Sequence, residues 1–266
     1  MTIGLSTYSF FWQWHATADR PLSLAGMLAR TQEWGADLLQ ICDYPAVEEY
    51  DEGQLLALAK EARRRDLGLE LGTRGIGVEH LERYLGLAQR LDVRLVRSMV
   101  PAAEADHAET LLRAVLPAYE RAGVVLALET YEQIPTTRLV DVVESLDSPA
   151  LGVCLDPANC VAALEHPRDT VERTADHVVN LHVKDFSFSR QAGWVGFTLA
   201  GALLGQGMLD LAHLFARVRP EERGISQVVE HWLVWQGDSA TTCRVEDAWT
   251  RHSLARLREP AGTPRS

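Results

Sequence analysis

The sequence predicts a single-domain (β/α)8 (TIM) barrel, and three observations lead to this fold class. The chain has 266 residues, close to the roughly 250 that one such barrel usually needs. Short apolar runs alternate with longer amphipathic stretches from one end to the other, which is typical of repeated β–α units. Most of the short runs are continuously apolar, as expected for parallel strands that helices cover on their outer face.

Eight of the short runs have the length and composition of buried strands. They are Ile3–Ser9, Ala36–Cys42, Gly68–Gly72, Val93–Ser98, Val124–Thr130, Leu151–Leu155, Val178–Val183 and Ser226–Glu230. Eight strands, each followed by a helix, are the signature of the (β/α)8 barrel.

The stretches between the strands have helical periodicity and suitable ends. They are Pro21–Trp34, Leu55–Arg65, Glu79–Leu91, Ala108–Arg121, Thr137–Leu146, Pro167–Ala175, Leu209–Arg217 and Val245–Leu257. The first of these ends at Gly35 and the fourth closes on Gly123, and glycine is favoured just beyond a helix C-terminus. We therefore expect residues 1–258 to form the barrel, and residues 259–266, with two prolines and a glycine, to be a frayed tail.

The longest stretch without helical or strand assignment is Asp185–Met208, after the seventh strand. Loops of this length are often functional. Because this one follows the C-terminal end of a strand, we expect it to lie as an irregular segment over the mouth of the barrel.

Charge and composition narrow the classes of partner. The net charge of −11 and the pI of about 5.3 disfavour nucleic acid as a ligand. The N-terminal residues do not resemble a signal peptide, and no apolar run approaches the ~18 residues of a membrane span. We expect a cytoplasmic protein with reduced, buried thiols, since Cys42 and Cys154 lie in apolar strands and no pair forms a C-x-x-C motif.

Polar side chains follow the apolar runs at the places where strands end. Glu129, Asp156, His182 and Glu230 end or directly follow strands five to eight, which are neighbours around a closed barrel. Burying such groups without partners costs several kcal/mol. Three carboxylates and one imidazole suit one divalent cation, and we expect Mn²⁺ or Mg²⁺, with Co²⁺ and Zn²⁺ as alternatives.

Five short motifs resemble those of the xylose isomerase-like family of metal-dependent (β/α)8 barrels. They are ALET, CLDPAN, LHVKD, GQGMLD and VVEHW, in this order along the chain. The resemblance implies that Glu129, Asp156, His182 and Glu230 bind the metal, and that the two glutamates act as acid and base. Several ketose epimerases of the family have a histidine three residues after the aspartate, where this chain has Asn159, which departs from the pattern of a hexulose 3-epimerase.

This resemblance implies an isomerase or epimerase of a sugar or sugar derivative, which works by proton abstraction and a metal-stabilised enediolate. The alternative is a lyase of the same family, a dehydratase or decarboxylase of a keto-polyol or 3-oxo sugar acid. More distant alternatives are an endonuclease IV-like phosphodiesterase, disfavoured by the acidic charge, and a sugar-binding barrel without catalysis. The small-molecule partner is thus a sugar or sugar acid, and a homodimer or homotetramer is compatible with the fold.

Further residues near the strand ends are candidates for contacting the substrate. Lys184 is one of only two lysines, and strand alternation places it on the same side as His182, so we assign it a catalytic role. The predicted substrate-binding residues are Tyr8, Trp12, Trp14, Asp43, Arg74, Arg97 and Asn159. The two arginines suit an acidic substrate, and their alternative role is an ion pair with Asp43.

Overall fold

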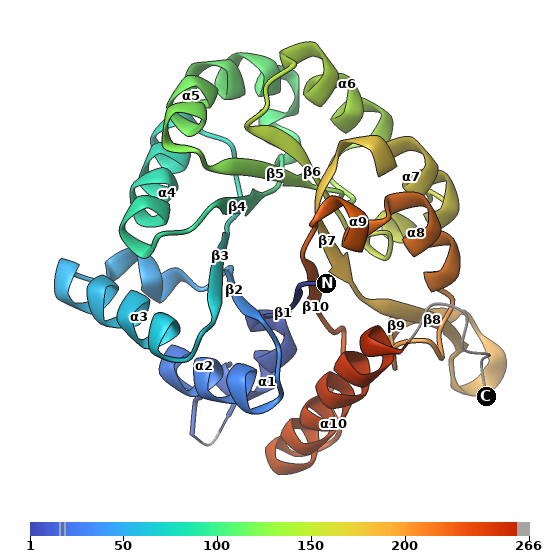
Figure 1. Ribbon diagram of the computed structural model, residues 1–266. Helices are drawn as coiled ribbons and strands as arrows, with labels where there is room; N and C mark the ends of the chain where they lie inside the picture. The colour runs from blue at the N-terminus through green and yellow to red at the C-terminus, as the bar shows by residue number, and fades with distance from the viewer. Residues whose placement is uncertain (16, 19, 260–266) are drawn as a thin grey trace.

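Eight parallel strands close into a barrel in the computed structural model, which describes residues 1–15, 17–18 and 20–259. The order around the barrel is β1, β10, β7, β6, β5, β4, β3, β2, and the helices surround it (Figure 1). The strands are β1 (Ile3–Ser6), β2 (Leu38–Cys42), β3 (Gly68–Gly72), β4 (Leu95–Ser98), β5 (Val125–Glu129), β6 (Leu151–Leu155), β7 (Val178–Val183) and β10 (Gln227–Val229). The predicted fold class is confirmed.

Helices connect the strands, and the longer ones surround the barrel (Figure 1). The helices are α1 (Phe11–Trp14), α2 (Leu24–Glu33), α3 (Glu52–Arg64), α4 (Val78–Leu91), α5 (Ala108–Ala122), α6 (Thr136–Leu146), α7 (Pro167–Thr174), α8 (Leu211–Val218), α9 (Pro220–Arg223) and α10 (Ser239–Arg258). Helix α3 begins three residues before its predicted start, because Asp51 and Gln54 form a capping box. None of the helices in the described ranges combines the length and apolar character needed to cross a bilayer.

The ends of two elements differ from the predicted ends, and part of the predicted tail is not described. The first strand ends at Ser6 rather than Ser9, because Thr7–Phe10 form a 3-10 helix whose N-cap, Ser6, accepts a hydrogen bond from the backbone of Tyr8. Helix α10 begins at Ser239, six residues before the predicted Val245, after Asp238 caps it. Within the tail predicted to fray, residues 260–266 lie outside the described residues.

The segment after β7 is more regular than predicted. Strands β8 (Asp185–Arg190) and β9 (Phe197–Ala202) pair as an antiparallel hairpin, from Asp185 opposite Ala202 to Arg190 opposite Phe197. The hairpin follows directly after β7 and projects from the barrel (Figure 1). The prediction of an irregular segment was therefore wrong over these residues, and the alternation of phenylalanine and serine in FSFS was the strand signal.

A short glycine-containing loop ties this hairpin back to the barrel. The carboxylate of Asp185 accepts hydrogen bonds from the backbone nitrogens of Gly205, Gly207 and Leu209 at 2.9–3.0 Å. A Cβ added at Gly207 would lie 2.2 Å from Asp185 Oδ1, so only glycine fits there. The GQGML part of the GQGMLD motif thus wraps one carboxylate next to Lys184.

Candidate metal centre and adjoining pocket

The four residues predicted to bind metal lie together at the C-terminal mouth of the barrel. Glu129 ends β5, Asp156 follows β6, His182 lies in β7 and Glu230 follows β10. Each offers one ligand atom, and these atoms all lie within 4.8 Å of one another. All four side chains are buried. Such a cluster of carboxyl and imidazole groups can hold a divalent cation.

Each of the four ligand residues has a buried atom without a hydrogen bond, although Glu129 Oε2 and Asp156 Oδ2 form ion pairs with Arg97 and Lys184. Glu129 Oε2, Asp156 Oδ2, His182 Nδ1 and Glu230 Oε1 are buried and make no hydrogen bond of acceptable geometry. An unsatisfied buried polar atom costs about 1–3 kcal/mol, and a charged one more. His182 Nδ1 and Glu230 Oε1 have the clearest deficit, and a cation coordinated by the four residues would relieve it. The donor set therefore fits the divalent metal that the sequence predicts.

A buried polar network, absent from the sequence predictions, orients the ring of His182. His182 Nε2 lies 2.8 Å from Gln40 Oε1, while Gln40 Nε2 donates to Glu70 and Asn180 at 3.0 and 3.1 Å. Because the amide nitrogen of Gln40 faces two acceptors, its oxygen accepts from His182, which places a proton on Nε2. Nδ1 then faces the cluster, 3.2 Å from Glu129 Oε1 and 3.5 Å from Glu230 Oε2. The network selects the nitrogen through which His182 would bind a cation.

Lys184 is buried among the ligand residues. Its Nζ lies 2.7 Å from Asp156 Oδ2 and 3.3 Å from Glu230 Oε2, and 4.5 Å from the centre of the Trp232 ring. Burial lowers the pKa of Lys184, but Asp156 and Glu230 outweigh burial, so the pKa lies above its usual value. The amine is therefore protonated at neutral pH. Trp232 was not predicted as a site residue, although it lies within the VVEHW motif.

Arg97 connects Glu129 to Asp43. It forms an ion pair with Glu129 Oε2, lies 3.3 Å from Asp43 Oδ1, and donates to the carbonyl of Thr73 at 2.9 Å. Arg97 therefore forms the ion pair with Asp43 that was the predicted alternative to binding an acidic substrate.

Glu129 has neighbours at both of its oxygens. Asn159 Nδ2 donates to Glu129 Oε1 at 2.9 Å, while Arg97 contacts Oε2. Burial raises the pKa of Glu129, but Arg97 and His182 lower it more, to about 2. Glu129 is therefore a carboxylate with little tendency to accept a proton. Asn159 holds the carboxylate of Glu129 in place. Asn159 itself stands at the position where several ketose epimerases of the family have histidine.

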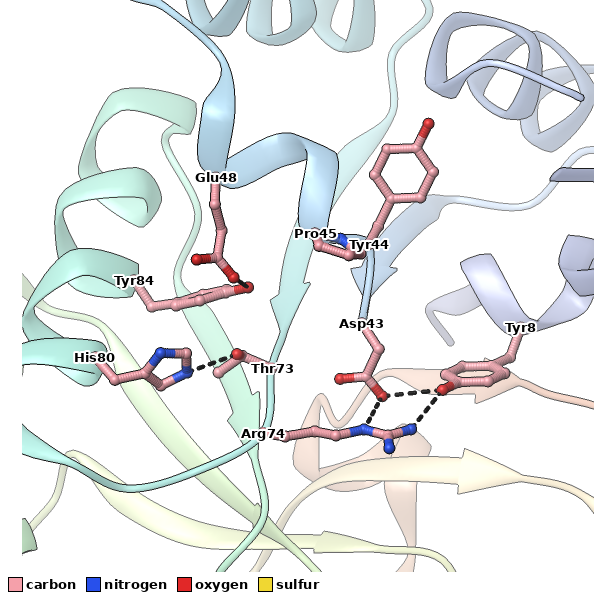
Figure 2. A pocket seen from close by; sticks show the side chains of 9 residues that line it. All are labelled: Tyr8, Asp43, Tyr44, Pro45, Glu48, Thr73, Arg74, His80 and Tyr84. Atoms are coloured by element: carbon pink, nitrogen blue, oxygen red, sulfur yellow. Dashed lines mark hydrogen bonds and ion pairs between the residues drawn. The ribbon is translucent and has the colours of Figure 1, made fainter. Parts of the chain in front are cut away.

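Three of the predicted substrate-binding residues line one side of a pocket of about 370 Å³ next to this centre. Arg74 Nε donates to Asp43 Oδ2 at 3.0 Å and Arg74 Nη2 lies 2.7 Å from the hydroxyl of Tyr8, which donates to Asp43 (Figure 2). The opposite side carries residues that the sequence analysis missed. They include Glu48, Thr73, His80 and Tyr84. His80 and Tyr84 lie on α4, and no pattern in that helix distinguishes them from its other polar residues.

Trp12 and Trp14 do not line this pocket. Both are half-buried, and their indole nitrogens donate to the backbone carbonyls of Leu233 and Thr7. The ring of Trp14 also packs edge-on against Tyr44, with ring centres 5.1 Å apart. Since Tyr44 lines the pocket, Trp14 supports the wall from behind, and the prediction that the two tryptophans contact substrate stays a prediction.

The closed parallel barrel and the cluster of three carboxyl groups and one imidazole at its mouth define a class of (β/α)8 barrels in which a divalent metal could be held at the C-terminal mouth. Within that class, the chain belongs to the xylose isomerase-like TIM barrel family, whose sequence model matches residues 28–259.

Comparison with known proteins adds one similar sequence and two similar structures. The chain is 55% identical over 258 residues to a 3-oxo-isoapionate decarboxylase from Pectobacterium atrosepticum, covering 96% of this chain and 94% of the relative. A D-psicose 3-epimerase structure superposes with a TM-score of 0.75 at 13% identity, covering 99% and 100% of the two chains. A xylose isomerase-like barrel from Mycobacterium smegmatis in complex with magnesium gives 0.67 at 16% identity, with 97% of each chain covered. At these identities the two structures show the shared fold.

Proposed function

We propose that this protein is a metal-dependent decarboxylase of a 3-oxo sugar acid, with 3-oxo-isoapionate or a close analogue as its substrate. The observation that carries this proposal is the 55% identity to a 3-oxo-isoapionate decarboxylase across 96% of the chain. The lyase, given above as the alternative, thus takes precedence over the isomerase or epimerase. The two possibilities share the barrel and the candidate ligands and differ in the bond that breaks.

The chemistry of a 3-oxo acid defines what the site must do. The bond between the carboxylate carbon and C2 breaks, CO2 leaves, and the electron pair of that bond moves toward the oxo group. C2 then takes up one proton, so the reaction consumes one proton for each CO2 released. A divalent cation held by Glu129, Asp156, His182 and Glu230 would supply Lewis acidity for the oxo oxygen, which gains negative charge.

Lys184 is the group that we assign as proton donor to C2. It is a protonated amine in a buried position, and it lies next to two of the metal ligands. Glu230 Oε2 accepts a hydrogen bond from Lys184 Nζ at 3.3 Å, which holds the amine beside the metal ligands, and the amine takes up a proton from solvent after each turnover. Trp232 covers the amine on another side, which limits the access of water.

The position of Arg97 supports decarboxylation over proton abstraction. Isomerisation and epimerisation require a base that removes a proton from carbon. Glu129 is a poor candidate for that role, because Arg97 binds one of its oxygens and its pKa is held at about 2. Burial raises the pKa of Glu230, the other glutamate, but His182 and Lys184 lower it more, so Glu230 is also a weak base. Loss of CO2 needs no such base. Arg97 is buried, and its guanidinium group already contacts Glu129, Asp43 and Thr73. It is therefore less free to bind the carboxylate of an acidic substrate than its position in the sequence indicated.

A product assay tests this proposal. The Mn²⁺-loaded protein is incubated with 3-oxo-isoapionate and, separately, with a panel of ketoses in ²H2O. We expect CO2 from the acid in equal amount to its consumption, and no deuterium incorporation into the ketoses. Glu129→Gln should be inactive, whereas Glu109→Gln, which alters an ion pair with Arg138 on the protein surface, should retain activity. Epimerised ketose without CO2 release from the acid would overturn the proposal.

A further inference from the structure

The pocket beside the metal centre shares a wall with it. Tyr8, Asp43 and Thr73 follow β1, β2 and β3, at the same end of the barrel as the metal ligands. Asp43 contacts one amino group of Arg97, and the other amino group of Arg97 contacts Glu129. Asp43 in the pocket wall and the candidate ligand Glu129 thus contact the same guanidinium group, which places the pocket and the metal centre within the span of one small molecule at this mouth of the barrel.

The charged groups that line this pocket already have partners of opposite charge. Asp43 is paired with Arg74 at 3.0 Å, and Glu48 is paired with Arg83 at 3.1 Å and accepts a hydrogen bond from Tyr84 at 2.8 Å. His80 Nε2 lies 2.8 Å from the hydroxyl of Thr73. A carboxylate or phosphate that entered the pocket would compete with Asp43 for Arg74 and would face the oxygens of Asp43 and Glu48.

Hydroxyl groups suit the same lining without breaking any pair. The oxygens of Asp43 and Glu48 can accept further hydrogen bonds, because each carboxylate has about four lone-pair sites. The hydroxyls of Tyr8 and Thr73 can each accept one from a ligand hydroxyl. Tyr44 and Pro45 add apolar surface to the wall (Figure 2). Convergent acceptors and hydroxyls beside aromatic and proline surface match a neutral polyhydroxyl group.

We propose that this pocket is the subsite for the neutral, hydroxylated end of the substrate, the end furthest from the carboxylate. The identity of that substrate rests on the proposed function. In this orientation the carboxylate points away from Asp43 and Glu48, toward the Lys184 side of the centre. The pocket then selects polyhydroxylated 3-oxo acids over simple 3-oxo acids with the same reacting group.

A comparison of two substrates in two pocket variants tests this assignment. Thr73→Val removes a hydroxyl at nearly constant volume, and Glu48→Gln removes a carboxylate oxygen. Glu79→Gln, exposed on the same helix as His80, is the matched control. For 3-oxo-isoapionate we expect kcat/KM to fall roughly ten- to hundredfold in the two pocket variants. For 3-oxobutanoate, which has no hydroxyls, we expect changes below about twofold. An equal fall for both acids would overturn the assignment.

Binding of a neutral probe separates this assignment from the proposed function. Saturation-transfer NMR with Mg²⁺-loaded protein measures binding of erythritol and, as an anionic probe, succinate. Erythritol should bind the wild type and Glu79→Gln, and binding should be lost in Thr73→Val. If this pattern holds while no 3-oxo acid releases CO2, the decarboxylase proposal fails and the subsite stands. If CO2 is released but erythritol does not bind, or succinate occupies the pocket instead, the subsite assignment fails.

Discussion

Replacing Gln40 with leucine should weaken metal binding although Gln40 is not itself a candidate ligand. Gln40 Oε1 is the acceptor for His182 Nε2 at 2.8 Å, and both side chains are fully buried. Leucine has a similar volume but no acceptor. Nε2 would then lose its hydrogen bond to Gln40, and the ring would no longer be held by it with Nδ1 toward Glu129 and Glu230.

The size of the expected loss of metal affinity follows from two contributions. Leaving one buried polar group unpaired costs about 1–3 kcal/mol. Loss of a partner that orients a metal ligand typically lowers metal affinity 10- to 100-fold, or about 1.4–2.7 kcal/mol. We therefore expect the Kd for Mn²⁺, measured by titration calorimetry, to rise 10- to 100-fold. Because the carboxylates remain in place, binding should be weakened rather than abolished.

Gln13→Leu is the matched control for this substitution. Gln13 is also a buried glutamine, and its amide donates to Glu246 and Asp247 at 3.1 and 2.9 Å. It lies in a network apart from the metal ligands. Both variants should lose stability against urea, but the control should keep the Mn²⁺ affinity of the wild type. If Gln40→Leu also bound Mn²⁺ with unchanged affinity, the reasoning on the orientation of His182 would be refuted.

Three other predictions concern the proton donor, the metal and a second buried carboxyl group. Lys184→Met should slow CO2 release by roughly 10²- to 10⁴-fold with Mn²⁺ binding retained in calorimetry; loss of binding as well would indicate a structural role. Chelation with EDTA should abolish CO2 release and lower Tm by several degrees, and Mn²⁺ or Mg²⁺ should restore both; an unchanged Tm and rate would exclude the metal. Burial raises the pKa of Glu246 from 4.5 to about 8, so the folded state favours the protonated form. The contribution of Glu246 to the free energy of unfolding is fully present below about pH 4.5 and is lost as the pH rises through 8. The free energy of unfolding of Glu246→Gln, relative to the wild type, should thus increase from pH 5 to pH 9 by at most about 5 kcal/mol, and urea titrations showing a constant difference would contradict this.

The sequence predicts the candidate metal ligands well because their positions follow from topology. In a closed parallel barrel every strand ends at the same mouth, so polar residues that end neighbouring strands must converge. Glu129, Asp156, His182 and Glu230 satisfy this condition without any knowledge of register, and the structure brings them together. The prediction that His182 and Lys184 point to the same side depends only on strand alternation along β7 and the residue after it. Both side chains contact Glu230 in the cluster.

The network beneath the ligands could not be predicted in the same way. Gln40, Glu70 and Asn180 each interrupt an apolar strand, which is a visible signal that something buried needs them. Their partners, however, depend on how the barrel closes. Gln40 pairs with Glu70 through adjacent strands, but it meets Asn180 across 140 positions of sequence. Helix-borne His80 and Tyr84 reach the pocket only because α4 packs beside β3 and β4.

The contacts of Glu129 indicate how one family scaffold could perform either proton transfer or decarboxylation. Both reactions pass through negative charge on a former oxo oxygen, so both profit from a cation at the same four ligands. They differ in whether a carboxylate must also be free to take a proton from carbon. Here Arg97 and Asn159 bind the two oxygens of Glu129, and in the proposed reaction Glu129 holds a cation and does not act as a base. Under the proposed function, the chemistry would depend on a substrate that releases CO2 without a base, and on Lys184 to deliver the proton that replaces it.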